Sequence, residues 1–297
     1  MNIRLIIVLL LLNTSVFAQL HTYKWTNGNK KAEGVVKDGL EQEKWTFWSK
    51  EGVIQQEVTY KDGEFHGEYI NYNKEGKKVE QGNFVRSMKE GECKVWYDNG
   101  QLELVGYNKI GYRDSLWTFY YPSGNKKEEG HFKRDERIGE WTSWYDNKQI
   151  KSKMLFDNGV AKMISFWSND GKGLVVNGNG QFIEYHENKN PQISGKYKDS
   201  LKTGLWIEYA NNGVKITEGS YKNNLRHGKW TSFRPDESIF SEGNYKDGVF
   251  DGTWKFWYAN GQLLKQVNYV GGKENGIYKE WFENGKLSAE GNYKDGK

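Results

Sequence analysis

Aromatic residues and glycines recur along this chain with a regular spacing of 24 residues. We number each repeat from the first aromatic residue of a Gly-x-aromatic element, which is position 0. Position 0 is occupied by Trp45, Tyr69, Cys93, Trp117, Trp141, Met163, Phe182, Trp206, Trp230, Trp254 and Tyr278. The spacing shortens between Trp141 and Phe182, and a partial unit with His21 at position 0 precedes Trp45. Such self-similarity predicts a string of about eleven supersecondary units that stack on one another.

The pattern inside one repeat is that of a β-hairpin. Polar and apolar residues alternate on both sides of a short turn sequence, which often reads Asn-Gly at positions +6 and +7, as in Asn99-Gly100 and Asn260-Gly261. Asn-Gly between two alternating runs is the strongest short-range hairpin signal, because a type I′ turn needs positive φ at both central residues. We therefore expect a two-residue turn at these positions. Cross-strand partners then have positions that sum to 13.

This register pairs large rings with glycines. The residue at position 0 faces the glycine at position +13, and the glycine at position −2 faces the aromatic residue at position +15. The predicted pairs are Trp117 with Gly130, Trp206 with Gly219, Trp230 with Gly243, Gly228 with Tyr245 and Gly204 with Tyr221. A ring that covers a glycine recovers the burial that glycine lacks, and it fixes the register of the strands. The pairs follow the two-residue period of a strand, which a helix does not have.

A single hairpin of this kind cannot bury its rings, because the aromatic residue at position +3 has the opposite parity and points to the other face. Stacked hairpins do bury them, so that stability becomes a sum over neighbours along the array. The sequence therefore predicts an all-β fold: an elongated, twisted antiparallel meander of about eleven stacked β-hairpins. We divide the chain into a signal peptide (1–18), a repeat array (19–160), an irregular stretch (161–181) that should bend or interrupt the array, and a second array (182–297).

Composition and charge exclude two classes of protein. Hydrophobic residues make up 36% of the chain and the mean hydropathy is −0.89, values that are typical of disorder. Aromatic residues nevertheless make up 15%, and disordered chains are poor in them. The net charge is +4 with basic and acidic residues interleaved, whereas a nucleic-acid-binding protein gathers its positive charge on one face. Cys93 is the only cysteine, so no intramolecular disulfide can form.

The first residues have the pattern of a secretory signal peptide. Arg4 supplies a positive charge, residues 6–12 are aliphatic, and Ser15 and Ala18 are small residues before an expected cleavage site at Gln19. The apolar run is too short to span a bilayer comfortably, and no later segment is apolar enough to cross one. We therefore expect an exported protein, periplasmic or extracellular if its source is bacterial.

The repeat resembles the MORN repeat. The resemblance is carried by Gly252-Thr-Trp254-Lys-Phe-Trp257-Tyr-Ala-Asn260-Gly261 and by Glu242-Gly243-Asn-Tyr245-Lys-Asp247-Gly248. The resemblance covers residues 21 to 297. The repeats resemble most closely those of the bacterial MORN-repeat-variant proteins, some of which are labelled as toxin–antitoxin antitoxins. The resemblance implies stacked β-hairpins in an extended sheet that interacts with proteins or membrane lipids or serves as a scaffold. It offers no catalytic residues to assign to this chain.

The side chains that carry chemistry form no catalytic or metal-binding pattern. The five histidines lie in different repeats, and none has the spacing of a metal-ligand pair. The Lys-Asp-Gly loops carry one carboxylate each, too few for the six to eight oxygens that calcium takes, so we interpret them as turns. The sequence predicts no enzyme activity, no metal site and no cofactor.

The aromatic row at position +3 is the candidate binding face. Its members are Trp96, Tyr120, Trp144, Tyr209, Phe233, Trp257 and Trp281. Rows of tryptophan and tyrosine on an extended sheet suit a binding partner, and packing within the protein is the competing role for such rings. The leading hypothesis is a scaffold for an unidentified protein partner, including an antitoxin-like or immunity-like role. Two alternatives stay open: a cell-wall or glycan-binding module, and peripheral binding to anionic lipid.

Overall fold

The computed structural model describes residues 17–297, which form an all-β structure. These residues contain no helix, and their strands pair antiparallel. The chain divides into two compact units, one ending at Glu136 and the other running from Arg137 to Lys297. The irregular stretch at 161–181 therefore lies within the second unit. The predicted signal peptide lies outside the described residues up to position 16.

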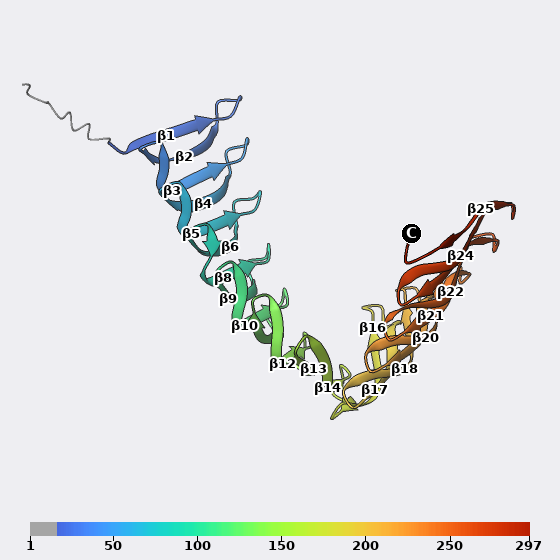
Figure 1. Cartoon of the computed structure of the whole chain (residues 1–297). Coiled ribbons are helices and arrows are strands. Elements are labelled where there is room, and N and C mark those ends of the chain that lie inside the picture. The colour runs from blue at the N-terminus through green and yellow to red at the C-terminus, as the bar shows by residue number, and fades with distance from the viewer. Residues whose placement is uncertain (1–16) are drawn as a thin grey trace, which may run out of the picture. The chain divides into compact units, whose positions relative to one another are not determined.

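In the first unit the strands follow one another as a meander of hairpins (Figure 1, blue to green). They are β1 (Gln19–Lys24), β2 (Lys30–Lys37), β3 (Leu40–Trp48), β4 (Ile54–Lys61), β5 (Glu64–Tyr72), β6 (Lys78–Val85), β7 (Met88–Lys89), β8 (Gly91–Trp96), β9 (Leu102–Lys109), β10 (Tyr112–Tyr120) and β11 (Lys126–Lys133). β1 with β2 and β3 with β4 form hairpins, and β2 pairs with β3 to join them. The two-residue β7 and the separate β8 both pair with β6, so this part of the array departs from the regular pattern.

The second unit has the same construction (Figure 1, green to red). Its strands are β12 (Glu136–Trp144), β13 (Ile150–Asp157), β14 (Val160–Trp167), β15 (Gly173–Val176), β16 (Asn179–Tyr185), β17 (Pro191–Lys198), β18 (Leu201–Tyr209), β19 (Lys215–Lys222), β20 (Leu225–Phe233), β21 (Ile239–Lys246), β22 (Val249–Trp257), β23 (Leu263–Val270), β24 (Lys273–Trp281) and β25 (Leu287–Tyr293). The short β15 falls in the irregular stretch. Val175 on that strand is fully buried, in a cluster with Phe166, Phe182 and Trp206.

The predicted fold class and register are confirmed. Trp117 pairs with Gly130, Trp206 with Gly219, Trp230 with Gly243, Gly204 with Tyr221 and Gly228 with Tyr245. The meander of stacked hairpins with a 24-residue repeat is therefore the observed architecture of each unit. The turns and the ring contacts differ from the prediction in three respects, and each difference has a physical reason.

The turn at positions +6 and +7 holds three residues rather than two. In the hairpin after Trp96, the Gly100 amide donates to the Tyr97 carbonyl at 2.8 Å, and the Tyr97 amide donates to the Gln101 carbonyl at 2.9 Å. In this loop only Gly100 has positive φ, at 83°, which is the geometry of a type I turn closed by a residue in the left-handed region. Trp96 pairs with Leu102, and one unpaired residue then restores the predicted register. The longer loop shifts the strand register by one residue, and the unpaired residue shifts it back. The predicted register beyond the turn is therefore correct.

Two consecutive residues with positive φ occur instead in the loops that join one hairpin to the next. Asp247 and Gly248 have φ of 50° and 89° and lie between the paired residues Lys246 and Val249. This is the two-residue type I′ geometry. The Lys-Asp-Gly sequences are turns, as predicted. The asparagine of Asn-Gly has a different role: its side chain makes hydrogen bonds at the turn.

Five tryptophans at position 0 each cover a glycine of the preceding hairpin: Trp45, Trp117, Trp206, Trp230 and Trp254. The predicted cover within one hairpin is therefore wrong for Gly219 and Gly243, whereas Tyr69 does lie over Gly82 of its own hairpin. A Cβ atom on Gly219 would lie 2.2 Å from the ring of Trp230. Trp230 pairs with Gly219 on one side and with Gly243 on the other, so the register alone does not choose between them. The indole N–H of Trp230 donates to the carbonyl of Ser220 at 3.0 Å, next to the covered Gly219. The contact therefore joins neighbouring hairpins.

The glycine at position −2 is needed for its backbone conformation rather than for space. Gly228 has φ of 71°, and a Cβ atom there would meet nothing within 4 Å. The pairing of β19 with β20 passes from Trp230 to His227, so Gly228 lies in a β-bulge. The predicted pairing of Gly228 with Tyr245 is correct, but Tyr245 does not cover Gly228.

Candidate functional site

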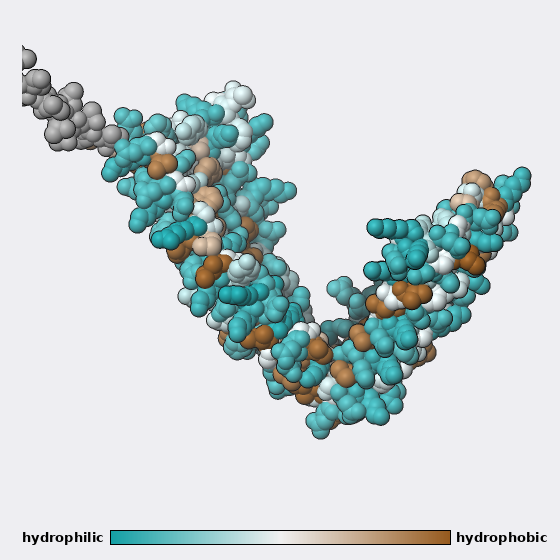
Figure 2. All heavy atoms as spheres, in the orientation of Figure 1, coloured by the Kyte–Doolittle hydropathy of each residue, from teal (hydrophilic) through white to brown (hydrophobic). Residues whose placement is uncertain are grey.

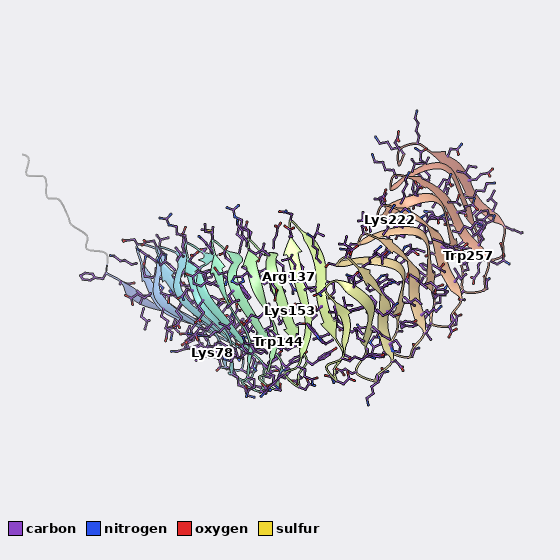
Figure 3. All side chains as sticks on the ribbon, turned by 90° about the horizontal axis from the view of Figure 1, so that it is seen from below. Lys78, Arg137, Trp144, Lys153, Lys222 and Trp257 are labelled. Carbon is purple, nitrogen blue, oxygen red and sulfur yellow. The ribbon has the colours of Figure 1, made fainter. Side chains whose placement is uncertain are left out.

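The seven aromatic residues predicted as a binding face lie at the turn ends of their strands. Trp96 ends β8, Trp144 ends β12 and Trp257 ends β22, and all seven residues are partly buried. We call positions +3 to +7 of the repeats within one unit its turn edge. Figure 3 shows Trp257 and Lys222 toward opposite ends of the strands of the second unit, so the turn edge and the type I′ loops lie at different sides of the sheet.

Asparagine side chains link several turns to the next one. Asn99 Nδ2 donates to the carbonyl of Pro122 at 2.8 Å, and Asn260 Nδ2 donates to the carbonyl of Glu283 at 3.1 Å. The Oδ1 atom of Asn260 also accepts the amide of Gln262 at 2.9 Å, which closes an Asx turn within its own loop. Asparagine is therefore selected at position +6 because it donates to the next hairpin and accepts within its own.

The residue at position +4 makes a second link between turns. The hydroxyls of Tyr97 and Tyr258 donate to the carbonyls of Tyr120 and Trp281, at 2.8 and 2.9 Å. Arg234 donates to the carbonyl of Trp257 from the same position of another repeat. Position +4 thus donates to the carbonyl of the next turn in these repeats, whether its side chain is a phenol or a guanidinium. The turn edge is therefore a fixed backbone that presents different side chains in different repeats.

Lysines of the preceding hairpin lie over several rings of the turn edge. The Nζ atom of Lys78 is 4.5 Å from the centroid of the Trp96 ring, and Nζ of Lys215 is 6.0 Å from that of Phe233. Such cation–π contacts at exposed sites contribute about 0.5–1 kcal/mol. Because a cation occupies one face of these rings, a flat ligand can stack on that face only by displacing the lysine.

An open cavity of about 440 Å³ lies at the turn edge of the first unit, next to Trp96. Its lining is Lys77, Lys78, Trp96, Tyr97, Asp98, Asn99 and Gly100. Nζ of Lys77 donates to the carbonyl of Asp98 at 3.4 Å, and Asn73 donates to the Asp98 carboxylate at 2.8 Å. Two lysines, a carboxylate, an amide and an indole thus share one shallow, open surface.

Hydrophobic side chains on the visible face are scattered in each unit. Figure 2 shows a mainly hydrophilic surface with small, separate hydrophobic patches. A large contiguous apolar patch would mark a membrane-binding or obligate interface. The visible face therefore suits a polar partner.

Sequence reasoning found the rings of the turn edge but missed the residues that surround them. The tyrosines at position +4 and the lysines at position +9, such as Tyr97 and Lys78, were not selected. Tyr97, Tyr121 and Tyr145 recur every 24 residues, and Lys30, Lys78 and Lys126 recur every 48, so this periodicity could have identified them. The structure brings Trp96 together with Lys78, and the use of any of the seven rings in binding stays a prediction.

Residues 17–297 were searched for membrane-spanning helices and for metal-binding clusters. Within this range there is no helix long and apolar enough to cross a bilayer. The same residues contain no group of three or more histidine, cysteine, aspartate or glutamate side chains placed to hold a metal ion.

Comparison with known proteins identifies one family and one distant likeness. The MORN repeat variant matches eight segments that together make up more than half of the chain: residues 44–62, 89–107, 113–134, 137–158, 202–223, 226–247, 250–270 and 274–295. No curated protein matches the chain. A crystal structure of TcdB2-TccC3-TEV is 12% identical, with a TM-score of 0.19, over 93% of this chain and 19% of that one. A Photorhabdus luminescens Tc holotoxin pore with mutation TccC3-D651A is 10% identical, with a TM-score of 0.17, over 89% and 16%. The chain thus spans less than a fifth of these proteins.

Proposed function

Because the chain belongs to the MORN repeat variant family, whose repeats mediate interactions, we propose that it is an exported, non-enzymatic scaffold that binds a protein partner through its turn edge. An antitoxin-like or immunity-like role outside the cytoplasm is the specific form of this proposal. Export is supported by the pattern of residues 1–18, with Arg4, an aliphatic run and Ala18 before the expected cleavage site.

The observation that carries the proposal is the mixed chemistry of the turn edge beside Trp96. Lys78 lies over the indole, and Asp98 and Asn99 line the same open cavity. Protein interfaces use such combinations: an aromatic anchor surrounded by polar groups that exclude water. The anchor is held by bonds between turns, so binding costs little ordering of the scaffold.

A glycan ligand is the second candidate, because rings recur at position +3 of successive hairpins. Two strands separate equivalent rings, which places them on the order of 10 Å apart. A β-1,4-linked polysaccharide repeats over a comparable length. The lysine over the Trp96 ring argues against it, since a sugar needs an uncovered ring face to stack.

The experiment is affinity capture with the chain from Gln19 onward as bait and the envelope fraction of the source organism as prey. The bait is compared with a Trp96→Ala, Lys78→Ala double variant. Tyr107→Ala is the matched control, because Tyr107 is an exposed aromatic residue of the same unit that lies away from the turn edge. Thermal melting of all three baits checks that the fold is retained.

We expect a protein that wild type and the Tyr107 variant retain and the double variant loses. The wild type could instead retain purified peptidoglycan or anionic vesicles, and the double variant could lose that material while it captures the same proteins. This result would show that the turn edge binds a glycan or a lipid. If all baits retain the same material, the turn edge is not the binding surface. Amino-terminal sequencing of the exported protein tests the cleavage site separately, and an intact Met1 in a cytoplasmic fraction would reject export.

A further inference from the structure

We propose that β25 of one molecule pairs with β1 of a second copy of this chain, so that the repeat array continues head to tail from molecule to molecule. The inference is independent of the proposed partner. It starts from the two strands that have one neighbour each among the described residues: β25 pairs with β24, and β1 pairs with β2. An unpaired edge offers a row of backbone donors and acceptors to another chain.

The open edge of β25 has an uncovered glycine. Gly34, Gly106, Gly195, Gly219 and Gly243 are each covered by the tryptophan of the following hairpin, at 2.1–2.2 Å from a Cβ atom built on the glycine. A Cβ atom on Gly291, at the same position of the last repeat, would meet nothing within 4 Å. The strand is exposed along nearly its whole length. It therefore presents the surface that receives a following hairpin elsewhere in the chain.

The open edge of β1 carries the residues that would fit there. β1 contains position 0 of the first partial repeat, occupied by His21, followed by Thr22 and Tyr23. His21 pairs with Gly34 on its inner side, as position 0 does in each regular hairpin. Tyr23 is 51% exposed, and its ring stacks on Trp45 with centroids 6.1 Å apart. The outer side of β1 corresponds to the side by which later hairpins pair with their predecessors.

The chain contains an internal example of the proposed contact. β2 presents Ala32-Glu33-Gly34 to the following β3, and β25 has the same three residues, Ala289-Glu290-Gly291. Across the β2–β3 junction Ala32 faces Phe47 and Glu33 faces Thr46, while Trp45 covers Gly34. With β1 in the same register, Ala289 faces Tyr23, Glu290 faces Thr22 and Gly291 lies under His21. An aromatic residue faces alanine and threonine faces glutamate in both junctions.

The two junctions differ at position 0, where His21 is smaller than the tryptophan of the regular repeats. The imidazole fills only part of the slot over Gly291, and the paired strands have only six and seven residues. Such a contact belongs to the low end of interface size, below about 1,200 Å². We therefore expect weak, concentration-dependent association through a heterologous contact that repeats.

Sedimentation velocity of the chain from Gln19 onward, over a wide concentration range, measures the association. Two variants act in opposite directions. His21→Trp restores the ring of the internal junctions and should lower the concentration of half-association by about tenfold, which corresponds to roughly 1.4 kcal/mol. Gly291→Trp should abolish association, because an indole on this strand cannot share the slot with His21. Its side chain enters open space in the single molecule, so the melting temperature of the monomer should stay unchanged.

A disulfide trap tests the register. Thr22→Cys and Glu290→Cys are made in separate chains, and the buried Cys93 stays as an internal thiol. Mixing the two variants under mild oxidation should give a dimer that neither variant gives alone. A dimer from the Glu290→Cys variant alone would replace the proposal by pairing of two β25 edges. Association that is unaffected by Gly291→Trp, or a monomer at every concentration, would overturn it.

Discussion

The ring of Trp254 lies over Gly243 of the preceding hairpin, and its indole N–H donates to the carbonyl of Asn244 at 3.0 Å. A Cβ atom on Gly243 would lie 2.2 Å from this ring, so no other residue is accommodated without moving the indole. The tryptophan thereby closes one hairpin onto another. This contact is one specific link between neighbouring hairpins, in a fold whose stability depends on such neighbours.

Gly243→Val should therefore destabilise the junction between β21 and β22. We expect a loss of about 2–3 kcal/mol from overpacking, together with the loss of the Trp254 bond. Hydrogen exchange should rise on β22, and the urea midpoint should fall. Gly291→Val is the control, because its equivalent site is uncovered. If Trp230 rather than Trp254 were displaced, the faster exchange would appear in β20, and the assignment of rings to preceding hairpins would be wrong.

Ring size at position 0 follows the residue that the ring meets on the preceding strand. A glycine precedes the tryptophan at five junctions, whereas Val58 faces Tyr69 and Val267 faces Tyr278. Gly82 is the exception: Tyr69 of its own hairpin already covers it, and the following position 0 is Cys93. Val267 is fully buried. The larger residue on one strand is thus matched by a smaller ring on the next, as close packing requires.

A Val267→Gly, Tyr278→Trp double variant should convert the valine–tyrosine junction into a glycine–tryptophan junction. Val267→Gly alone should cost about 2–4 kcal/mol, because it leaves a cavity and adds backbone freedom. Tyr278→Trp alone should clash with Val267. The double variant should recover part of both losses, with a coupling energy of about 1–3 kcal/mol in a double-mutant cycle of urea unfolding. Additive losses would contradict size matching.

The register was predictable from the sequence because it depends on parity and repeat length, which glycines and rings mark directly. The direction in which Trp230 leans was not, since Gly219 and Gly243 both flank it in the sheet. The Trp230 ring donates to the Ser220 carbonyl, but Trp206 lies over Gly195 of its preceding hairpin in the same way although its buried Nε1 has no hydrogen-bond partner among the described residues, so the bond alone does not set the direction. The rings of the candidate site were found by the same periodicity. Their lysine neighbours were missed because contact across hairpins is 18 residues apart for Lys78 and Trp96.

The two-residue turn predicted from Asn-Gly differs from the observed three-residue turn for a related reason. Asparagine is favoured where φ is positive and also where a side chain caps a turn. Asn99 and Asn260 serve the second purpose, since each accepts an amide in its own loop and donates to the next hairpin. Only coordinates distinguish the two roles, because both produce the same dipeptide.

Substitution of Asn260 should separate these two bonds. Asn260→Asp keeps the acceptor for the Gln262 amide and loses the donor to Glu283. Asn260→Ala loses both, so we expect a cost of about 1 kcal/mol for the aspartate and a larger cost for the alanine. Hydrogen exchange of the loop at 282–286 reports the link between hairpins. Equal losses for the two variants would show that the link to Glu283 is the only contribution.

The polar cluster beside Cys93 gives the first unit a pH-dependent contribution to stability. Glu80 accepts hydrogen bonds from the Tyr69 hydroxyl at 2.7 Å and from Asn71 at 2.9 Å, and it pairs with Lys89 at 2.6 Å. Burial opposes ionisation of Glu80, but the hydrogen bonds from Lys89, Tyr69 and Asn71 outweigh it and hold its pKa below the ordinary 4.5. The cysteine at position 0 leaves room for this cluster where other repeats have a ring.

Because the folded pKa of Glu80 is lowered, its contribution is fully present above the unfolded value and is lost as the pH falls through the folded value. Glu80→Gln should therefore lower the urea midpoint at pH 7 and lower it less at a pH well below 4.5. Other carboxylates contribute to acid unfolding of both proteins, so the difference between wild type and variant is the quantity to measure. Glu75→Gln, at an exposed loop carboxylate, is the control and should shift neither midpoint. A wild-type–variant difference that is constant with pH would show that Glu80 contributes through packing rather than through its charge.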